Sequence, residues 1–75
     1  MTHELFHATN DEGSAAARKR VVDLGIVERI RFRNIFYPEV QADFRARGGT
    51  ELPALWDGTT LHQGVGPVLA LLEAL

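Results

Sequence analysis

The sequence of 75 residues contains no cysteine, which excludes disulfide bonds and every reaction that needs a thiolate of the protein. It also lacks a long apolar run, since the longest covers only residues 65–75 and a membrane-spanning helix needs about 20 residues. The formal net charge of -2 provides no general positive field for nucleic acid or an anionic membrane. We therefore expect neither nucleic acid nor a membrane among its partners.

The residues that are present are typical of a small globular protein. Hydrophobic residues make up 45% of the chain and charged residues 24%, which is typical of folded domains rather than disordered chains. We find no repeat, low-complexity stretch or linker, so residues 1–75 are expected to form one domain. The first residues lack the basic and then apolar order of a signal peptide, and the expected compartment is the cytoplasm.

The N-terminal third predicts a strand followed by a helix. Residues 3–7 are a short strand candidate. Thr9, Asn10 and Asp11 then offer helix N-caps, and Glu12 would complete a capping box with Thr9. Glycine at position 25 ends the helix. The residues expected on its buried face are Ser14, Ala17, Val21 and Leu24.

Residues 28–35 alternate between polar and apolar side chains, as in a strand with one buried face. Ile30 and Phe32 are expected on the buried face. The opposite face would carry Arg29, Arg31 and Arg33. Such a row is typical of a sheet edge, where charge prevents association with other edges, and it could also bind a phosphate or a carboxylate.

The second half predicts a short helix, a hairpin and a final helix. Pro38 suits the first turn of the short helix, which the glycines at positions 48 and 49 end. Residues 52–56 and 59–62 are expected to form antiparallel strands around an Asp57-Gly58 turn. The final helix is expected from Gly66 to Leu75.

The final helix has more large apolar residues than one buried stripe requires. We expect some of its leucines to stay exposed after packing on the sheet. They would suit a protein partner or a homodimer, although one or two exposed leucines need no partner. The residues concerned are Val68, Leu69, Leu71, Leu72 and Leu75.

Together the elements follow the order β-α-β-α-β-β-α. Two β-α-β connections before a hairpin predict a four-stranded mixed sheet with three helices, because right-handed crossovers place their helices on the sheet faces. The predicted fold class is α/β, and this order is that of the thioredoxin-like fold.

Three motifs resemble glutaredoxins and the N-terminal domain of glutathione transferases, and the resemblance covers nearly the whole chain. The most specific is residues 51–58, Glu-Leu-Pro-Ala-Leu-Trp-Asp-Gly. It is similar to the family segment in which a cis-proline begins the third strand before an Asp-Gly hairpin. The resemblance implies that the peptide bond before Pro53 is cis. It also implies that the main chain of Leu52 can pair with the cysteine of glutathione, so a peptide-like ligand is a candidate.

The second motif lies where the family has its CxxC or CxxS sequence. Residues 11–14 read Asp-Glu-Gly-Ser, so Asp11 stands at the position of the nucleophilic cysteine and Ser14 matches the serine of the CxxS type. The resemblance therefore implies a redox-inactive domain, since a carboxylate attacks no disulfide. By itself, Asp11 is expected to be a helix N-cap.

The third motif follows the hairpin, where the family holds the γ-glutamyl end of glutathione. Gln63 matches the transferase pattern, Gly64 replaces a serine, and Val65 follows. Main-chain amides there could still bind an anion. Glutathione is the one candidate cofactor.

Other polar and aromatic residues are expected to be structural. His3, His7 and His62 lack metal-ligand spacing, and we interpret them as ordinary strand residues. Trp56 could stack on a ligand, but an aromatic residue in an apolar strand is more typical of a core.

Three functions remain open. We favour a cysteine-less glutaredoxin-like module that binds glutathione, a peptide or a protein. The first alternative is a weak glutathione-dependent, transferase-like enzyme, in which Ser14 or the amides of residues 10–13 stabilise the glutathione thiolate. The second is a structural or regulatory subunit that dimerises through its last helix. The sequence names no substrate.

Overall fold

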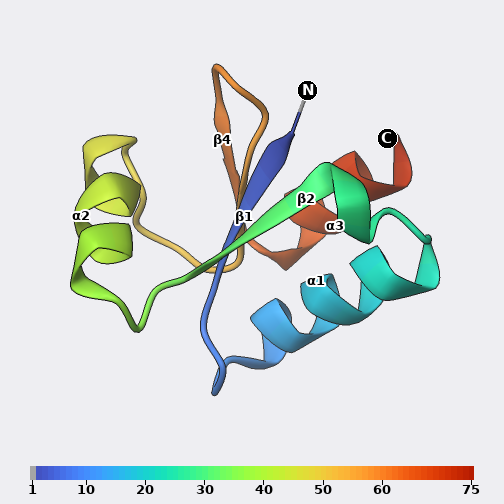
Figure 1. The fold of residues 1–75 in the computed structure, drawn as a ribbon, viewed down its shortest axis with the longest axis horizontal. Coiled ribbons are helices and arrows are strands. Elements are labelled where there is room, and N and C mark those ends of the chain that lie inside the picture. Colours follow the sequence, from blue (N-terminus) through green and yellow to red (C-terminus); the bar gives the residue numbers. More distant parts are fainter. Residues whose placement is uncertain (1) are drawn as a thin grey trace.

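The structure, a computed structural model, describes residues 2–75 as a four-stranded mixed sheet with three helices (Figure 1). The predicted α/β class and the predicted order of strands and helices are confirmed. The elements are β1 (His3–His7), α1 (Glu12–Asp23), the 3₁₀ turn η1 (Val27–Arg29), β2 (Ile30–Asn34), α2 (Pro38–Ala46), β3 (Ala54–Trp56), β4 (Leu61–Gln63) and α3 (Val65–Glu73).

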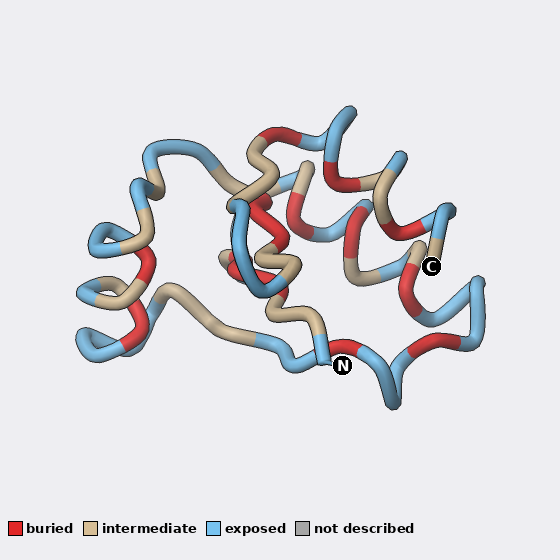
Figure 2. Tube along the Cα trace, turned by 90° about the horizontal axis from the view of Figure 1, so that it is seen from above, coloured by how far each residue is buried: buried red, intermediate tan, exposed pale blue. Residues whose placement is uncertain are grey.

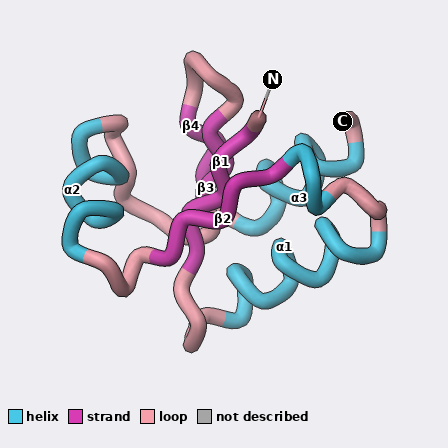
Figure 3. The backbone as a smooth tube through the Cα atoms, viewed as in Figure 1, coloured by secondary structure: helices cyan, strands magenta, loops and turns pink. Residues whose placement is uncertain are grey.

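The strand order in the sheet is β2-β1-β3-β4. β1 is parallel to β2 and antiparallel to β3, and β3 is antiparallel to β4. β1 is therefore central, and β2 is an edge strand, as its arginines predicted. This topology brings the carboxyl ends of β1, β2 and β4 and the start of β3 to one end of the sheet (Figure 3).

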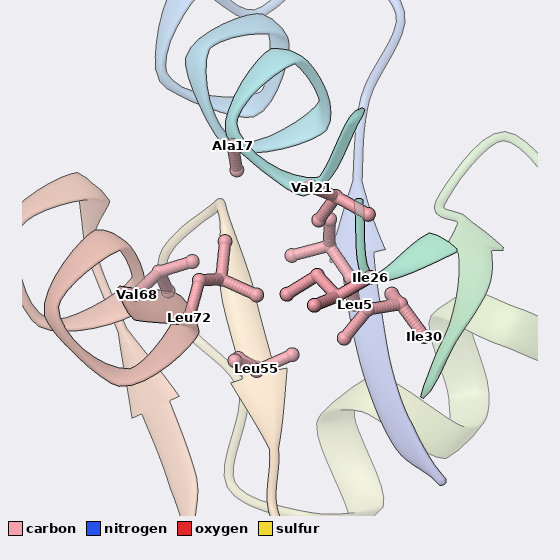
Figure 4. Packing of buried hydrophobic residues seen from close by; sticks show 8 residues of the cluster. All are labelled: Leu5, Ala17, Val21, Ile26, Ile30, Leu55, Val68 and Leu72. Atoms are coloured by element: carbon pink, nitrogen blue, oxygen red, sulfur yellow. The ribbon is translucent and has the colours of Figure 1, made fainter. Parts of the chain in front are cut away.

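One face of the sheet packs against α1 and α3. Leu5 of β1 and Leu55 of β3 are fully buried there, and the helices contribute the side chains that point toward them (Figure 4). An ion pair between Arg20 and Glu73 joins the two helices at the surface. The buried cluster consists of Leu5, Ala17, Val21, Ile26, Ile30, Leu55, Val68 and Leu72.

The other face is covered by α2 alone, which stands apart from α1 and α3 in Figures 1 and 2. Phe6, the neighbour of Leu5 in β1, points to this side because side chains alternate along a strand. It packs against Phe44 of α2, with 5.3 Å between ring centroids. Val40 and Ala54 complete this second cluster.

Four charged side chains join α2 to the sheet beside the second cluster. Glu4 of β1 pairs with Arg33 of β2 and with Arg47 at the end of α2, where the Arg47 contact is 3.0 Å. Asp43 pairs with the same two arginines, at 3.0 and 2.9 Å. Partial burial alone would raise the pKa of Glu4, but the hydrogen bonds from Arg47 and Arg33 hold this pKa below its ordinary value.

The two arginines of this network also lie over aromatic rings. Arg33 and Arg47 lie 5.2 and 5.5 Å from the centroid of Phe6, and Arg47 lies 4.8 Å from that of Trp56. Trp56 is half-buried and packs against the second cluster, in agreement with its predicted core role. The guanidinium groups thus extend the apolar core outward through cation–π contacts.

Helix α1 begins as one of the predicted caps requires. Asp11 is the N-cap, and its Oδ2 accepts a hydrogen bond of 2.7 Å from the backbone N–H of Ser14. The alternative capping box of Thr9 and Glu12 was therefore wrong, because the N-cap lies at Asp11, two residues after Thr9. On the predicted stripe, Leu24 is also wrong: it follows the last turn and is 40% exposed, whereas the other three residues are fully buried.

The strand predicted over residues 28–35 is shorter, because residues 27–29 form the turn η1. Ile30 is buried as predicted, but Phe32 is 38% exposed because it lies at the edge of the sheet. The arginines do not form one solvent-facing row either. Arg29 and Arg31 are exposed, whereas Arg33 is largely buried in the network with Glu4.

The hairpin is confirmed, but its tip is shifted by one residue. Trp56 pairs with Leu61, and the N–H of Asp57 donates to the carbonyl of Thr60 at 3.1 Å, which leaves residues 58 and 59 at the tip. Asp57 precedes the tip because its Oδ1 accepts from the backbone N–H groups of Thr59 and Thr60, at 2.8 and 2.7 Å. The strands cover residues 54–56 and 61–63 rather than 52–56 and 59–62.

Helix α3 begins one residue before the predicted start and ends two residues before the predicted end. Its Val68 and Leu72 are buried in the first cluster. The remaining leucines are half-buried and pack against that cluster, so the exposed leucine surface is smaller than expected: Leu69, Leu71 and Leu75. Dimerisation through this helix stays a prediction.

Phe44 requires glycine at position 49, because a Cβ there would lie 2.4 Å from two carbons of the Phe44 ring. We expect Gly49→Ala to lower the free energy of unfolding by about 1–3 kcal/mol through overpacking. Urea unfolding measures this change. Gly66→Ala is the matched control, since a Cβ at position 66 meets nothing within 4 Å. Equal effects of the two substitutions would contradict the packing account.

A second prediction concerns His7, whose ring is buried beside Arg18, with 3.1 Å between Nδ1 and the guanidinium. Burial, and then the charge of Arg18, lower the pKa of His7 from 6.5. The unfolded chain then binds a proton that the folded chain does not bind, so stability falls as the pH drops below 6.5.

Chemical unfolding across this pH range tests the linkage. His7→Gln should remove most of the decline, whereas His3→Gln, which changes a less buried histidine of the same strand, should retain it. Glu4 contributes at lower pH, below its ordinary value of 4.5, because its pKa is lowered. A slope that survives His7→Gln unchanged would contradict the account.

Candidate functional site

Three segments distant in the sequence meet at one end of the sheet: the start of α1, the start of β3 and the start of α3. A Cβ at Gly13 would lie 3.0 Å from Cδ of Pro53 and 3.6 Å from Cβ of Val65. The same point is 3.5 Å from Oδ2 of Asp11. The N–H of Gly64 donates to the carbonyl of Pro53 at 2.9 Å. The structure thus brings together the three motifs that the resemblance singled out.

The peptide bond between Leu52 and Pro53 is cis, as predicted. Pro53 is buried, and the Leu52 side chain packs against the cluster under α2. Within residues 2–75, neither the N–H nor the C=O of Leu52 takes part in a hydrogen bond. Because Leu52 lies just before β3, these two groups offer one donor and one acceptor to an extended ligand.

Asp11 brings a negative charge to this site. One carboxylate oxygen caps α1, where the helix dipole favours an anion. The charge has no ion-pair partner within the described residues. Since like charges repel, a carboxylate here disfavours a thiolate at the same place and favours a neutral or cationic ligand group.

Ser14 lies below the site rather than in it. Its side chain is fully buried, and its Oγ accepts a hydrogen bond of 3.1 Å from the N–H of Ala8. The hydroxyl therefore links the first turn of α1 to the loop that follows β1. The sequence predicted Ser14 as a residue of the site, and it carried no signal that the hydroxyl is engaged inside the fold.

The Gln63 side chain also has a structural role beside the site. Its Oε1 accepts hydrogen bonds from the backbone N–H groups of Thr50 and Glu51, at 2.8 and 2.9 Å. Its Nε2 donates to the carbonyl of Gly48 at 3.2 Å. The side chain that the resemblance assigned to a γ-glutamyl group thus holds the loop that leads to Leu52.

The start of α3 offers less room for an anion than its sequence predicts. Gly64 has a φ of 93°, which favours glycine, and a Cβ at this residue would lie 2.8 Å from Oε2 of Glu51. The Glu51 carboxylate therefore lies beside Gly64, the residue before the first turn of the helix. Val65, the first helical residue, is exposed beside Gly13 and offers an apolar contact.

Two surface hollows extend from this end of the sheet and share Ile35. The larger, about 510 Å³, lies between α2 and the loop before β3, and it is lined by Ile35, Gln41, Phe44, Arg45, Gly49 and Thr50. The smaller, about 220 Å³, separates the loops after β1 and β2, and it is lined by Ala8, Thr9, Asn10, Asn34, Ile35 and Phe36. Sequence reasoning missed most of these residues because the topology, rather than any motif, places them together.

The histidines lie in different environments. His7 is buried, His3 lies at the start of β1, and Nε2 of His62 lies 2.9 Å from Oδ2 of Asp57. This hydrogen bond and those from the Thr59 and Thr60 amides hold the pKa of Asp57 well below its ordinary value. Among residues 2–75, no group of three His, Asp or Glu side chains is arranged to hold a metal ion. None of the described helices is long and apolar enough to cross a membrane.

We expect Ser14→Ala to lower the free energy of unfolding by about 1–3 kcal/mol, because the partly buried N–H of Ala8 loses its acceptor. Thr9→Ala is the matched control, since it removes an exposed hydroxyl from the same loop. Thermal or urea unfolding measures both variants. If Thr9→Ala is the more damaging of the two, the role assigned to Ser14 is wrong.

A comparison of the chain with protein-family models and with curated proteins found no match.

Proposed function

We propose that this chain is a cysteine-less, glutaredoxin-like domain of the thioredoxin-like fold that binds glutathione or a short extended peptide without reacting with it. The strand order β2-β1-β3-β4 and the mixed pairing around β1 support the fold assignment. The meeting of Gly13, Pro53 and Val65 supports the resemblance to a glutathione site, because its three parts lie far apart in the sequence.

The observation that carries the proposal is the open main chain of Leu52. Its N–H and C=O face no partner within residues 2–75, and they lie in the loop next to the start of α1. A peptide or glutathione that runs alongside would form the two hydrogen bonds of a short strand pair. This recognition depends on the backbone, so it survives the loss of the cysteine.

The larger hollow suits the rest of such a ligand. Its volume of about 510 Å³ is within the usual range for small-molecule sites. Gln41 and Arg45 line it from α2, and Arg45 is exposed without an ion-pair partner among the described residues. A terminal carboxylate of glutathione would pair with this guanidinium.

Two observations argue against a reaction at this site. Asp11 places a carboxylate where the fold's chemistry needs a thiolate, and it would oppose ionisation of a bound thiol. Ser14 is buried and accepts a hydrogen bond from the backbone, so it does not face a ligand. Binding without turnover is therefore the function that the geometry supports best.

An NMR titration of the protein with reduced glutathione tests binding. The expected shifts fall on the amides of Gly13, Leu52 and Val65, with smaller ones around Arg45. The absence of shifts at millimolar glutathione would remove both glutathione binding and the glutathione-dependent enzyme as functions.

Neutralising the charge at position 11 tests whether the ligand lies beside Asp11. Reduced glutathione carries net negative charge, so Asp11→Asn should strengthen binding several-fold at low salt, since the amide oxygen still caps α1. Asp23→Asn, an equal charge change at the far end of α1, should leave the affinity nearly unchanged. Equal gains from both variants would indicate that only the net charge matters and that the ligand does not lie beside Asp11.

A further inference from the structure

The outer edge of β2 is a second surface with unused hydrogen-bonding groups, separate from the loop at Leu52. β2 pairs with β1 on one side, and no described strand lies on its other side (Figure 1). The N–H of Ile35 donates to the carbonyl of His7 at 2.9 Å. The main-chain groups of successive residues in a parallel strand point in alternate directions. The N–H and C=O groups of Arg31 and Arg33 therefore also face β1, and those of Phe32 point outward.

The open part of this edge has defined ends. The N–H of Ile30 donates to the carbonyl of Val27, and the carbonyl of Asn34 accepts from the N–H of Tyr37 at 3.3 Å. What remains is the C=O of Ile30, both groups of Phe32 and the N–H of Asn34. This is the set that a short added strand requires.

Exposed aromatic rings lie along and just beyond the same edge. Phe32 is 38% exposed, Phe36 is 76% exposed and Tyr37 is 49% exposed. The rings of Phe36 and Tyr37 contact each other edge to face, with 5.5 Å between centroids. Large aromatic side chains this exposed are typical of sites where a partner protein binds and buries them.

The edge also carries unneutralised positive charge. Arg29 and Arg31 are exposed, and neither belongs to an ion pair within the described residues. Arg33, by contrast, is engaged by Glu4 and Asp43. Glu28 and Glu39 flank this stretch, but residues 29–37 contain three arginines and no acidic residue, so the strip has a net positive charge.

This charge distinguishes between possible occupants. A second copy that paired its β2 antiparallel around Phe32 would place Arg31 of one chain beside Arg33 of the other. Like charges opposite each other destabilise a strand pair. A segment with acidic side chains is attracted at the positions where a second copy is repelled. Its apolar residues can cover Phe36 and Tyr37.

We propose that β2 binds an extended acidic segment of a partner protein, which adds to the sheet as a further strand and buries the aromatic rings after Asn34. The main-chain groups around Phe32 supply affinity without regard to sequence. Arg29 and Arg31 select acidic over basic segments and prevent pairing between copies of this chain.

The probe is a synthetic peptide of about nine residues in which glutamate and valine alternate, compared with a peptide in which lysine replaces glutamate. NMR titration should show binding of the acidic peptide alone, with the largest shifts at Ile30, Phe32 and Asn34. Shifts confined to Gly13, Leu52 and Val65 would instead assign the peptide to the site of the proposed function and overturn the role of β2.

Three comparisons separate strand addition from general attraction. The acidic peptide with every amide N-methylated keeps its charge but cannot donate hydrogen bonds, and its binding should be lost. Arg31→Glu should weaken binding at least about tenfold at low salt. Lys19→Glu, an equal change on the exposed face of α1, should weaken it much less. Retained binding of the N-methylated peptide, or equal effects of the two variants, would overturn the proposal.

Discussion

The whole structure depends on β1, because this one strand is buried on both faces and paired on both edges. Leu5 and Phe6 are neighbours in the sequence, yet one contributes to the core under α1 and α3 and the other to the core under α2. β2 pairs in parallel with β1, and β3 pairs antiparallel. Each helix therefore takes its position from the same five residues, and so does the end of the sheet where the candidate site forms.

The polar side chains around the candidate site already make contacts within the fold. Asp11 caps α1, Ser14 holds the loop after β1, and Gln63 holds the loop before β3. Glu51 lies against the start of α3. The groups left for a ligand are the main chain of Leu52 and the walls of the hollow beside α2. A site of this kind selects shape and backbone rather than chemistry, which is why we propose binding in place of a reaction.

The sequence predicted the order of elements well, because period-two and helical patterns, glycine stops and the Asp11 cap are local signals. It failed where tertiary contacts decide. The hydrophobic pattern could not show that Phe32 lies beyond the cover of α1, or that Arg33 turns inward to Glu4. The hairpin tip lies one residue after its predicted position because the Asp57 side chain accepts hydrogen bonds from backbone amides.

For the site, the motifs singled out Asp11, Ser14, Leu52 and Pro53, which the structure brings to one end of the sheet, but they did not indicate the direction of each polar group. The partners of Ser14 and Gln63 are backbone amides, and any residue type can supply one. The hollow lined by Gln41 and Arg45 depends on how α2 sits on the sheet. Neither feature leaves a sequence signal of its own.

The proposed glutaredoxin-like site requires that position 11 lies at a helix N-terminus that stabilises a negative charge, as the position of the nucleophile does in those proteins. The most direct measurement is the thiol pKa of Asp11→Cys, followed by thiolate absorbance against pH. Thr59→Cys, at the tip of the hairpin, is the reference. Our account predicts a pKa at least about one unit below the ordinary value of about 8.5 for position 11, and an ordinary value for position 59. Equal pKa values at the two positions would contradict it.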